Sequence, residues 1–402
     1  MSMSKKTYDG YRSYSYLKKG DDYPDIRLAK DVDRVPSRTV DLSEAEERRA
    51  RAILDREQIV SMHDHTSIFP EDMARCLEQR RTGRDATGYA GLAISDTDVV
   101  FENFMDGTAT ITSNKGWKWD DVIFDLGTRY SDFAHQDLVY VASRYDDLLR
   151  AKREGRIAFV PWFEAATPIE NEVDRVDVLY GLGVRGMGIT YSEANALGSG
   201  LREKNDSGLS DLGRSVVKRM NRLGMTIDIA HCGDRTGLEV IEASEKPITI
   251  THAGARGLWN SRRMKTDETL KKMAEKGGVI GVEAAPHTSQ VPGKPHTLDA
   301  VMAHVEYCVQ LIGVDHVGLG PDTLFGDHVG LHSAFAQQLS LAAIRDSGPA
   351  YTPVKYVDGM ENPGEAMRNA VRWLSKHGYS DTDVAKIAGG NALRVLKETW
   401  AK

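Results

Sequence analysis

Short apolar segments of strand length alternate with longer amphipathic segments of helical length along most of this chain. The predicted strands are residues 58–62, 107–112, 157–163, 184–190, 225–230, 248–251, 279–282 and 316–320. The predicted helices between them are residues 132–153, 172–182, 209–223, 236–244, 266–276 and 298–312. Strands that alternate with helices indicate βαβ units and a parallel sheet. Eight parallel strands are the number that closes a (β/α)8 barrel, so we predict an α/β fold of the TIM-barrel type.

The N-terminal part of the chain departs from this alternating pattern. Residues 1–57 are predicted as an extension that ends in a helix, because Ser43 and Glu46 have the spacing of a capping box. Residues 58–402 are predicted as the barrel domain, with an irregular insertion at about 67–130, after the first strand. The tail, residues 365–400, is predicted to form two or three further helices.

An open, doubly wound sheet is the rival fold. Such a sheet binds its ligand at one switch point in the strand order, whereas polar side chains follow several different strands here. Nucleotide binding has no support, because the chain has neither a G-x-G-x-x-G motif after the first strand nor a P-loop.

The composition argues against several classes of protein. The 402 residues carry a net charge of −7, which argues against a general nucleic-acid binder. The three cysteines are far apart and form no CxxC pair, so neither a zinc ribbon nor a disulfide framework is indicated. The first residues contain no signal-like apolar region, and no apolar run of about 18 residues occurs. We therefore expect a cytoplasmic protein that does not span a membrane.

Side chains that bind metals end several of the predicted strands. His63 and His65 end the first, Glu164 follows residues 157–163, and His231 and His252 end two successive strands. Barrel enzymes carry their chemistry at the C-terminal ends of the strands, and imidazole and carboxylate groups are common zinc ligands. Each of these residues alone is more often structural, but together they predict a metal site. Side chains two apart on a strand share a face, so Asp64 is expected to point away from the two histidines.

Two further residues are candidates for catalysis and substrate binding. Asp322 follows the last predicted strand, where its carboxylate could accept a proton and pass it on. Arg263 lies in the loop after His252, where its guanidinium could pair with a substrate carboxylate through two hydrogen bonds. The alternatives are a turn aspartate and a surface arginine.

Several longer motifs carry a family resemblance. They are L-Y-G-L-G-V-R at 179–185, G-L-S-D-L-G-R at 208–214, M-N-R-L-G-M at 220–225, D-I-A-H at 228–231, S-R-R at 261–263, G-L-G-P-D at 318–322 and G-G-N-A-L-R at 389–394. In this order and spacing, the chain from residue 157 onward resembles the membrane (renal-type) dipeptidase family, peptidase family M19. The resemblance implies metallopeptidases built on amidohydrolase-like barrels.

The resemblance also implies roles for the candidate residues. It implies two zinc ions, or another divalent metal, with His63 and the residue at 65 on one ion, His231 and His252 on the other, and Glu164 bridging them. Asp322 would be the proton shuttle, and Arg263 would bind the terminal carboxylate of the substrate.

Two positions depart from the family pattern. Position 65 is usually aspartate in the family and is histidine here, which removes one negative charge from the expected ligands. Tyr191 stands where the family typically has a histidine that polarises the scissile carbonyl, and its hydroxyl can donate a hydrogen bond in the same role. Both departures suggest a specificity that differs from that of an ordinary dipeptidase.

The sequence therefore predicts a zinc-dependent hydrolase of the M19 type. The expected reaction is attack on a dipeptide, or a similar small amide with a carboxylate, by a hydroxide between two ions. Two alternatives stay open: a hydrolase of a lactone, cyclic amide or N-acyl amino acid, and an inactive metal-binding barrel that binds a ligand. The expected partner is a small molecule, and self-association into a homo-oligomer is left open.

Overall fold

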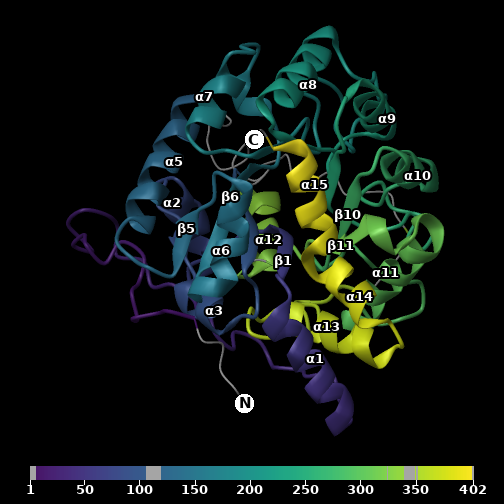
Figure 1. Ribbon diagram of the computed structural model, residues 1–402. Helices are drawn as coiled ribbons and strands as arrows, with labels where there is room; N and C mark the ends of the chain where they lie inside the picture. The colour runs from purple at the N-terminus through teal and green to yellow at the C-terminus, as the bar shows by residue number, and fades with distance from the viewer. Residues whose placement is uncertain (1–5, 106–118, 324, 339–348, 350–351, 401–402) are drawn as a thin grey trace.

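Eight parallel strands form the centre of the protein. The computed structural model describes residues 6–105, 119–323, 325–338, 349 and 352–400. The eight strands are hydrogen-bonded in chain order as β1 (Val60–Asp64), β4 (Val99–Met105), β6 (Ile157–Phe163), β7 (Gly186–Gly188), β8 (Thr226–Asp228), β9 (Thr249–Ala253), β10 (Val279–Val282) and β11 (Val317–Leu319). Figure 1 shows these strands surrounded by helices.

The sheet curls until its last strand lies beside its first. Strand β11 contacts β1. The backbone N–H of Asp322, just beyond β11, donates to the carbonyl of His63 in β1 at 3.1 Å. This bond joins the two edges of the sheet at the C-terminal ends of the strands. The architecture is a nearly closed (β/α)8 barrel, and the predicted fold is confirmed.

The outer helices follow the strands and pack against them. They are α6 (Tyr145–Glu154), α7 (Arg175–Gly181), α8 (Asp211–Leu223), α9 (Asp234–Ala243), α10 (Asp267–Glu275), α11 (Leu298–Ile312) and α15 (Asn391–Thr399). Helix α8 shows how local sequence sets the bounds. The Ser210 hydroxyl accepts a hydrogen bond from a backbone N–H of the first turn, and Gly224 ends the helix at a φ of 78°.

The strands are buried on both faces. All seven residues of β6 are buried, and so are all residues of β10 and β11. A parallel strand covered by helices on one side and by the barrel interior on the other is expected to be apolar throughout. The predicted strand at 157–163 and the one at 279–282 coincide with β6 and β10 for this reason.

The region between residues 100 and 155 differs from the prediction in two places. The strand expected at 107–112 lies wholly outside the described residues, and the second barrel strand in the described part of the chain is β4, which ends at Met105. It falls inside the segment predicted as an insertion. The single helix expected at 132–153 is instead helix α5 (Trp119–Phe133), strand β5 (Val139–Val141) and helix α6. The β-branched and aromatic sequence Val-Tyr-Val favours β5, which pairs with β6 outside the barrel order.

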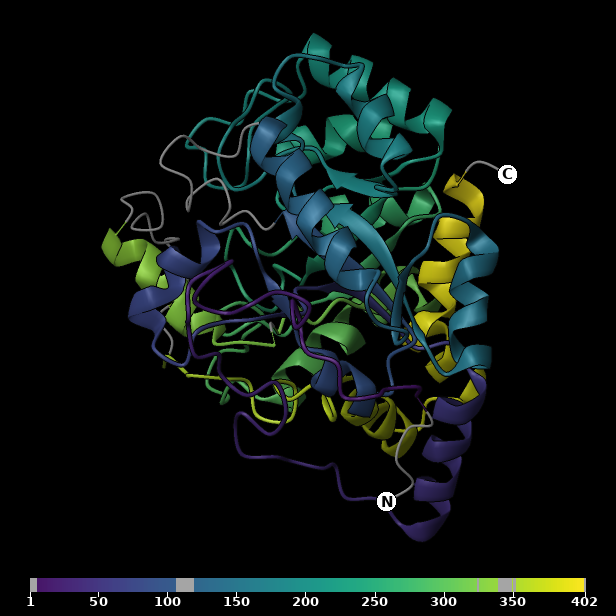
Figure 2. The ribbon, with the colours of Figure 1, turned by 90° about the vertical axis from the view of Figure 1, so that its left-hand side faces the viewer.

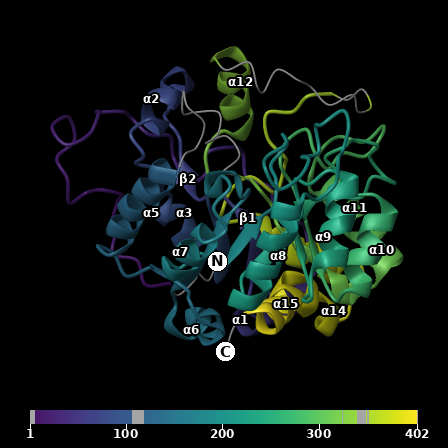
Figure 3. The same ribbon diagram turned by 90° about the horizontal axis from the view of Figure 1, so that it is seen from above.

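The segment between β1 and β4 forms small elements beyond the C-terminal end of β1. Strands β2 (Ser67–Ile68) and β3 (Ala86–Thr87) pair antiparallel, and the other elements are η1 (Met73–Arg75), α2 (Cys76–Arg80) and α3 (Tyr89–Ile94). Helix α12 (His328–Gln338), which follows β11, packs beside α2, and Figure 3 shows the two on the same side of the barrel.

The N-terminal arm packs on strand β3 and on helix α5. Figure 2 shows the purple arm crossing the blue segment. The backbone N–H of Tyr14 donates to the Asp132 carboxylate at 2.7 Å, and the Ser13 hydroxyl accepts from the Thr87 N–H at 2.7 Å. Helix α1 (Glu44–Arg56) begins at the predicted capping box of Ser43.

The C-terminal tail closes the outer layer of helices. It consists of helix α13 (Ala366–Lys376), which packs on α1, helix α14 (Asp381–Ala385), a π-helical turn η5 (Lys386–Gly390) and helix α15. The predicted two or three helices are confirmed. Across the described residues, no helix is long and apolar enough to cross a membrane.

A glycine at the closing edge of the barrel offers a test of this packing. A Cβ added at Gly320 would lie 1.9 Å from the backbone oxygen of Thr251 and 3.3 Å from the nitrogen of His63. We expect Gly320→Ala to lower the free energy of unfolding by about 1–3 kcal/mol, because backbone atoms must shift to make room. The matched control is Gly127→Ala on the exposed face of α5, where nothing lies within 4 Å. In that variant the free energy of unfolding should rise by up to about 1 kcal/mol, because alanine favours the helix more than glycine does. Thermal denaturation of both variants gives the measurement, and equal melting temperatures would contradict the close packing.

Candidate metal centre

Six polar side chains from five strands meet at the C-terminal end of the barrel. His63 and His65 come from β1 and its end, Glu164 follows β6, His231 follows β8, His252 lies in β9 and Asp322 follows β11. All six residues are buried. The strand ends bring them together although they are up to 259 positions apart in the chain.

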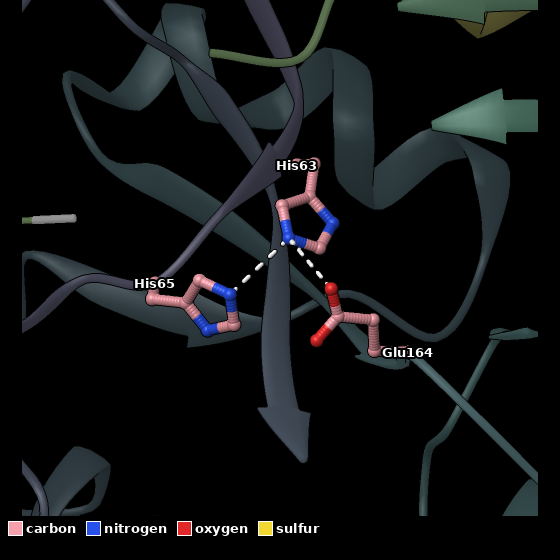
Figure 4. A group of neighbouring side chains, drawn as sticks. All are labelled: His63, His65 and Glu164. Carbon is pink, nitrogen blue, oxygen red and sulfur yellow. Dashed lines mark hydrogen bonds and ion pairs between the residues drawn. The ribbon is translucent and has the colours of Figure 1, made fainter. Parts of the chain in front are cut away.

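Glu164 lies at the centre of this group. Its Oε1 is 2.8 Å from Nε2 of His231, 3.1 Å from Nε2 of His252 and 3.8 Å from Nε2 of His63. Its other oxygen, Oε2, accepts a hydrogen bond from the side chain of Asn103 at 3.0 Å. One carboxylate oxygen therefore faces three imidazoles, while the other is held by a neutral amide on β4. Figure 4 shows Glu164 with two of the histidines.

His63 and His65 form the second half of the group. Their Nε2 atoms are 3.2 Å apart, and each is 3.6 Å from Oδ1 of Asp322. Figure 4 shows both rings on one side of β1. Asp64 between them points away, as expected, and its carboxylate accepts hydrogen bonds from the Ser61 hydroxyl and the Thr323 N–H.

The histidines are suited to bind metal because they are uncharged. Burial, and after it the positive charge of neighbours, holds the pKa of His63, His231 and His252 well below the usual value. A neutral imidazole offers a lone pair to a cation, whereas a protonated one does not. The Nε2 atoms of His231 and His252 are only 3.0 Å apart, so their two lone pairs repel unless a proton or a cation lies between them.

The geometry defines three overlapping groups of potential ligands. They are His63, His65 and Glu164; His63, His252 and Asp322; and Glu164, His231 and His252. Within each group, the ligand atoms lie within 4.8 Å of one another. Imidazole nitrogen and carboxylate oxygen together suit borderline divalent metals such as zinc. The residues therefore fit a buried metal site.

Asp322 differs from an ordinary surface aspartate. Burial, with the nearby negative charges of Glu164 and Glu283, raises its pKa well above the usual value. Its backbone has a φ of 52°, a conformation that non-glycine residues rarely adopt. A carboxyl group with a raised pKa at the edge of a metal site is suited to accept and release a proton.

Tyr191 and Arg263 both lie beside the histidines. The ring of Tyr191 stacks on His231, with ring centroids 4.2 Å apart. Arg263 donates from Nη1 to the backbone oxygen of His252 at 2.9 Å, and its Nη2 forms an ion pair with Glu283. The guanidinium predicted to bind a substrate carboxylate therefore already has a carboxylate partner.

Two residues of the site were missed in the sequence. Glu283 follows β10 directly and is completely buried. The sequence carried a signal for it, since Glu283 ends the apolar segment V-I-G-V just as Glu164 ends its own. Asn103 had no comparable signal, because its strand β4 was not predicted.

A family model supports the same interpretation. The model for membrane dipeptidase, peptidase family M19, matches residues 127–337, which is more than half of the chain. The chain belongs to the M19 family. Within the matched residues lie Glu164, His231, His252 and Asp322. His63 and His65 lie before the matched residues.

Curated relatives and solved structures are similar over large parts of the chain. Dipeptidase tcpJ of Claviceps purpurea is 26% identical over 266 residues, covering 66% of this chain and 56% of that protein. Dipeptidase verJ of Clonostachys rogersoniana is 31% identical over 206 residues, covering 50% of this chain and 51% of that protein. The chain thus spans about half the length of these relatives.

The solved structures agree on the fold. An amidohydrolase from Pseudomonas aeruginosa has a TM-score of 0.69 at 24% identity, covering 88% of this chain and 99% of that one. A metallopeptidase from Rhodobacter sphaeroides, liganded with a phosphinate mimic of the dipeptide L-Ala-D-Ala, has a TM-score of 0.66 at 17% identity, covering 86% and 99%. At these identities the likeness shows the fold alone.

The hydrogen bond from Asn103 to Glu164 yields a test of the site. We expect Asn103→Ala to weaken divalent-metal affinity by about 10–100-fold, because the bond orients a central carboxylate. Asn221→Ala is the matched control, since Asn221 is also buried but its side chain bonds Val217 and Ser244, which lie outside the site. Competition with a chromogenic chelator measures the affinity. Equal affinities for Asn103→Ala and Asn221→Ala would show that the bond does not support the site.

Proposed function

We propose that this protein is a metal-dependent hydrolase that cleaves a dipeptide or a similar small amide bearing a carboxylate. The observation that carries the proposal is the meeting of His63, His65, His231 and His252 around the buried carboxylate of Glu164. Membership of the M19 family supports the same chemistry. The relatives named as dipeptidases support the substrate class.

The proposed centre holds two divalent cations, zinc or a similar metal. His63 and His65 would hold one and His231 and His252 the other, with Glu164 shared between them, in line with two of the three ligand groups. When bound, such cations polarise a carbonyl group and make water a sufficiently strong nucleophile near neutral pH. The histidine at position 65 leaves the first cation with one negative charge fewer than the family pattern supplies.

The chain's own residues would position the substrate and move the proton. Asp322, 3.6 Å from both His63 and His65, would take a proton on its carboxylate and return it to the leaving amine. Tyr191, stacked on His231, would donate its hydroxyl hydrogen to the carbonyl oxygen as negative charge develops there. Arg263 would face the carboxylate of the substrate.

A second candidate is a hydrolase of a lactone, a cyclic amide or an N-acyl amino acid. The observation in its favour is the ion pair between Arg263 and Glu283, which gives the guanidinium a negatively charged partner without a substrate carboxylate. A panel that compares dipeptides with these compounds separates the two candidates. Turnover of none of them by protein with metal bound would favour an inactive, ligand-binding barrel.

Metal dependence is the first test of the proposal. We expect His231→Ala to lower the metal bound per chain and to abolish turnover, because it removes one imidazole from the Glu164 group. His135→Ala, at an exposed histidine outside the site, should retain both. Elemental analysis of protein purified without added metal, together with turnover assays, gives the measurement. Full metal content and full turnover in His231→Ala would refute the proposal.

The role of Asp322 is a separate test. We expect Asp322→Asn to lower kcat by about 10²–10⁴-fold, because an amide cannot take up and return the proton. Metal content should stay near that of the wild type, since four imidazoles and Glu164 remain. Asp315→Asn, at an exposed aspartate just before β11, is the control for the same substitution. An Asp322→Asn variant with wild-type kcat would exclude the proton-transfer role.

A further inference from the structure

We propose that Glu283 is a specificity-determining residue: it competes with the substrate's carboxylate for Arg263 and so lowers the preference of this site for a free carboxylate. The inference rests on the proposed function and refines its substrate class. The proposal predicts that this protein binds substrates whose carboxylate is masked, as a C-terminal amide or ester, nearly as well as substrates with a free carboxylate. If Arg263 had no partner, the free carboxylate would be preferred more strongly.

The position of Glu283 places it in the mouth of the barrel. It follows β10, between β9, which carries His252, and β11, which leads to Asp322. Its backbone N–H donates to the oxygen of Ala253 at 2.9 Å, and the next N–H, of Ala284, donates to Pro321 at 2.7 Å. Both neighbouring strand ends therefore hold the backbone on either side of the Glu283 side chain.

The ion pair also fixes the direction of the Arg263 side chain. Nη2 faces Glu283, and Nη1 bonds the backbone oxygen of His252. The Arg263 backbone N–H bonds the hydroxyl of Ser261 at 3.1 Å. The side chain of Arg263 is 14% exposed and that of Glu283 is 0% exposed. The guanidinium is therefore the accessible member of a pair whose carboxylate is fully enclosed.

The electrostatic consequence follows from this burial. An unpaired arginine would present a full positive charge to an incoming carboxylate. Paired with Glu283, the two side chains sum to zero charge, so a second carboxylate gains less from approaching Arg263 and meets repulsion from Glu283. An uncharged amide or ester meets no such repulsion, so its binding is not weakened by Glu283. Glu283 in turn cannot leave the pair at low cost, because a buried carboxylate without its partner is strongly destabilising.

A structural role for the pair is the competing interpretation. In that case Glu283 would hold Arg263 in place for the substrate, and its loss would weaken the binding of every carboxylate ligand. The two interpretations predict opposite signs for the effect of removing the charge of Glu283. A binding measurement therefore separates them.

The experiment compares two uncleavable ligands on the metal-loaded protein. One is a phosphinate analogue of an alanyl-alanine dipeptide with a free carboxylate, and the other is the same compound as its C-terminal amide. Calorimetry gives the dissociation constants for the wild type and for Glu283→Gln. We expect the preference for the free acid over the amide to rise by about tenfold in Glu283→Gln, which corresponds to about 1.4 kcal/mol. Turnover of the matching dipeptide and dipeptide amide should show the same shift in KM, with kcat changed less.

The matched control is Glu361→Gln. Glu361 is also buried and paired with an arginine, Arg34, but that pair joins the N-terminal arm to the segment before α13. It should leave the acid-to-amide preference unchanged. Should Glu283→Gln fail to fold, Glu283→Asp draws the carboxylate back by one methylene and should raise the preference by a smaller factor.

The outcomes are distinguishable. An unchanged or reduced preference for the free acid in the Glu283 variants, with both ligands still bound, would overturn the role of Glu283 and leave the proposed function standing. Wild-type protein that retains metal but binds neither ligand and cleaves neither peptide would overturn the proposed function and this inference together.

Discussion

The buried carboxylate of Glu164 among uncharged histidines is the interaction on which the rest of the site depends. A carboxylate removed from water costs several kcal/mol unless its charge is compensated. Neutral imidazoles cannot supply that compensation, and the amide of Asn103 holds only one of the two carboxylate oxygens. A divalent cation between Glu164 and the imidazoles satisfies both the carboxylate and the nitrogen lone pairs. The arrangement is therefore one that bound metal stabilises.

The barrel distributes charge unevenly around this centre. Strands β1, β6, β8 and β9 contribute the histidines and Glu164, while the ends of β10 and β11 contribute the acidic groups Glu283 and Asp322. Arg263, in the loop after β9, lies between the two sets and pairs with Glu283. The proposed ligand set has histidine at position 65, where the family resemblance predicts a negatively charged aspartate, whereas Glu283 adds negative charge beside Arg263. Both features act on charge balance and not on the shape of the barrel.

The parts of the fold that were predicted well are segments whose burial follows directly from the spacing of their apolar residues. The predicted bounds of β6, β10 and α11 agree with the structure, because each is an apolar or regularly amphipathic segment next to clear turn signals. Strand β4 was not predicted because it contains Glu102 and Asn103, which interrupt the apolar pattern. Both side chains are buried only because tertiary partners satisfy them: Arg129 pairs with Glu102, and Glu164 accepts from Asn103. Local pattern analysis does not see such partners.

The sequence by itself determined the kinds of side chain that end the strands, the alternation of strands and helices, and the family resemblance. These follow from local properties: the spacing of apolar residues and the residue types that bind metals. Only the tertiary structure decided that Arg263 meets Glu283, that Asn103 supports Glu164, and that the end of β11 bonds to β1. Each of these contacts joins residues on different strands or loops, and its geometry depends on strand register and barrel closure, which no local segment specifies.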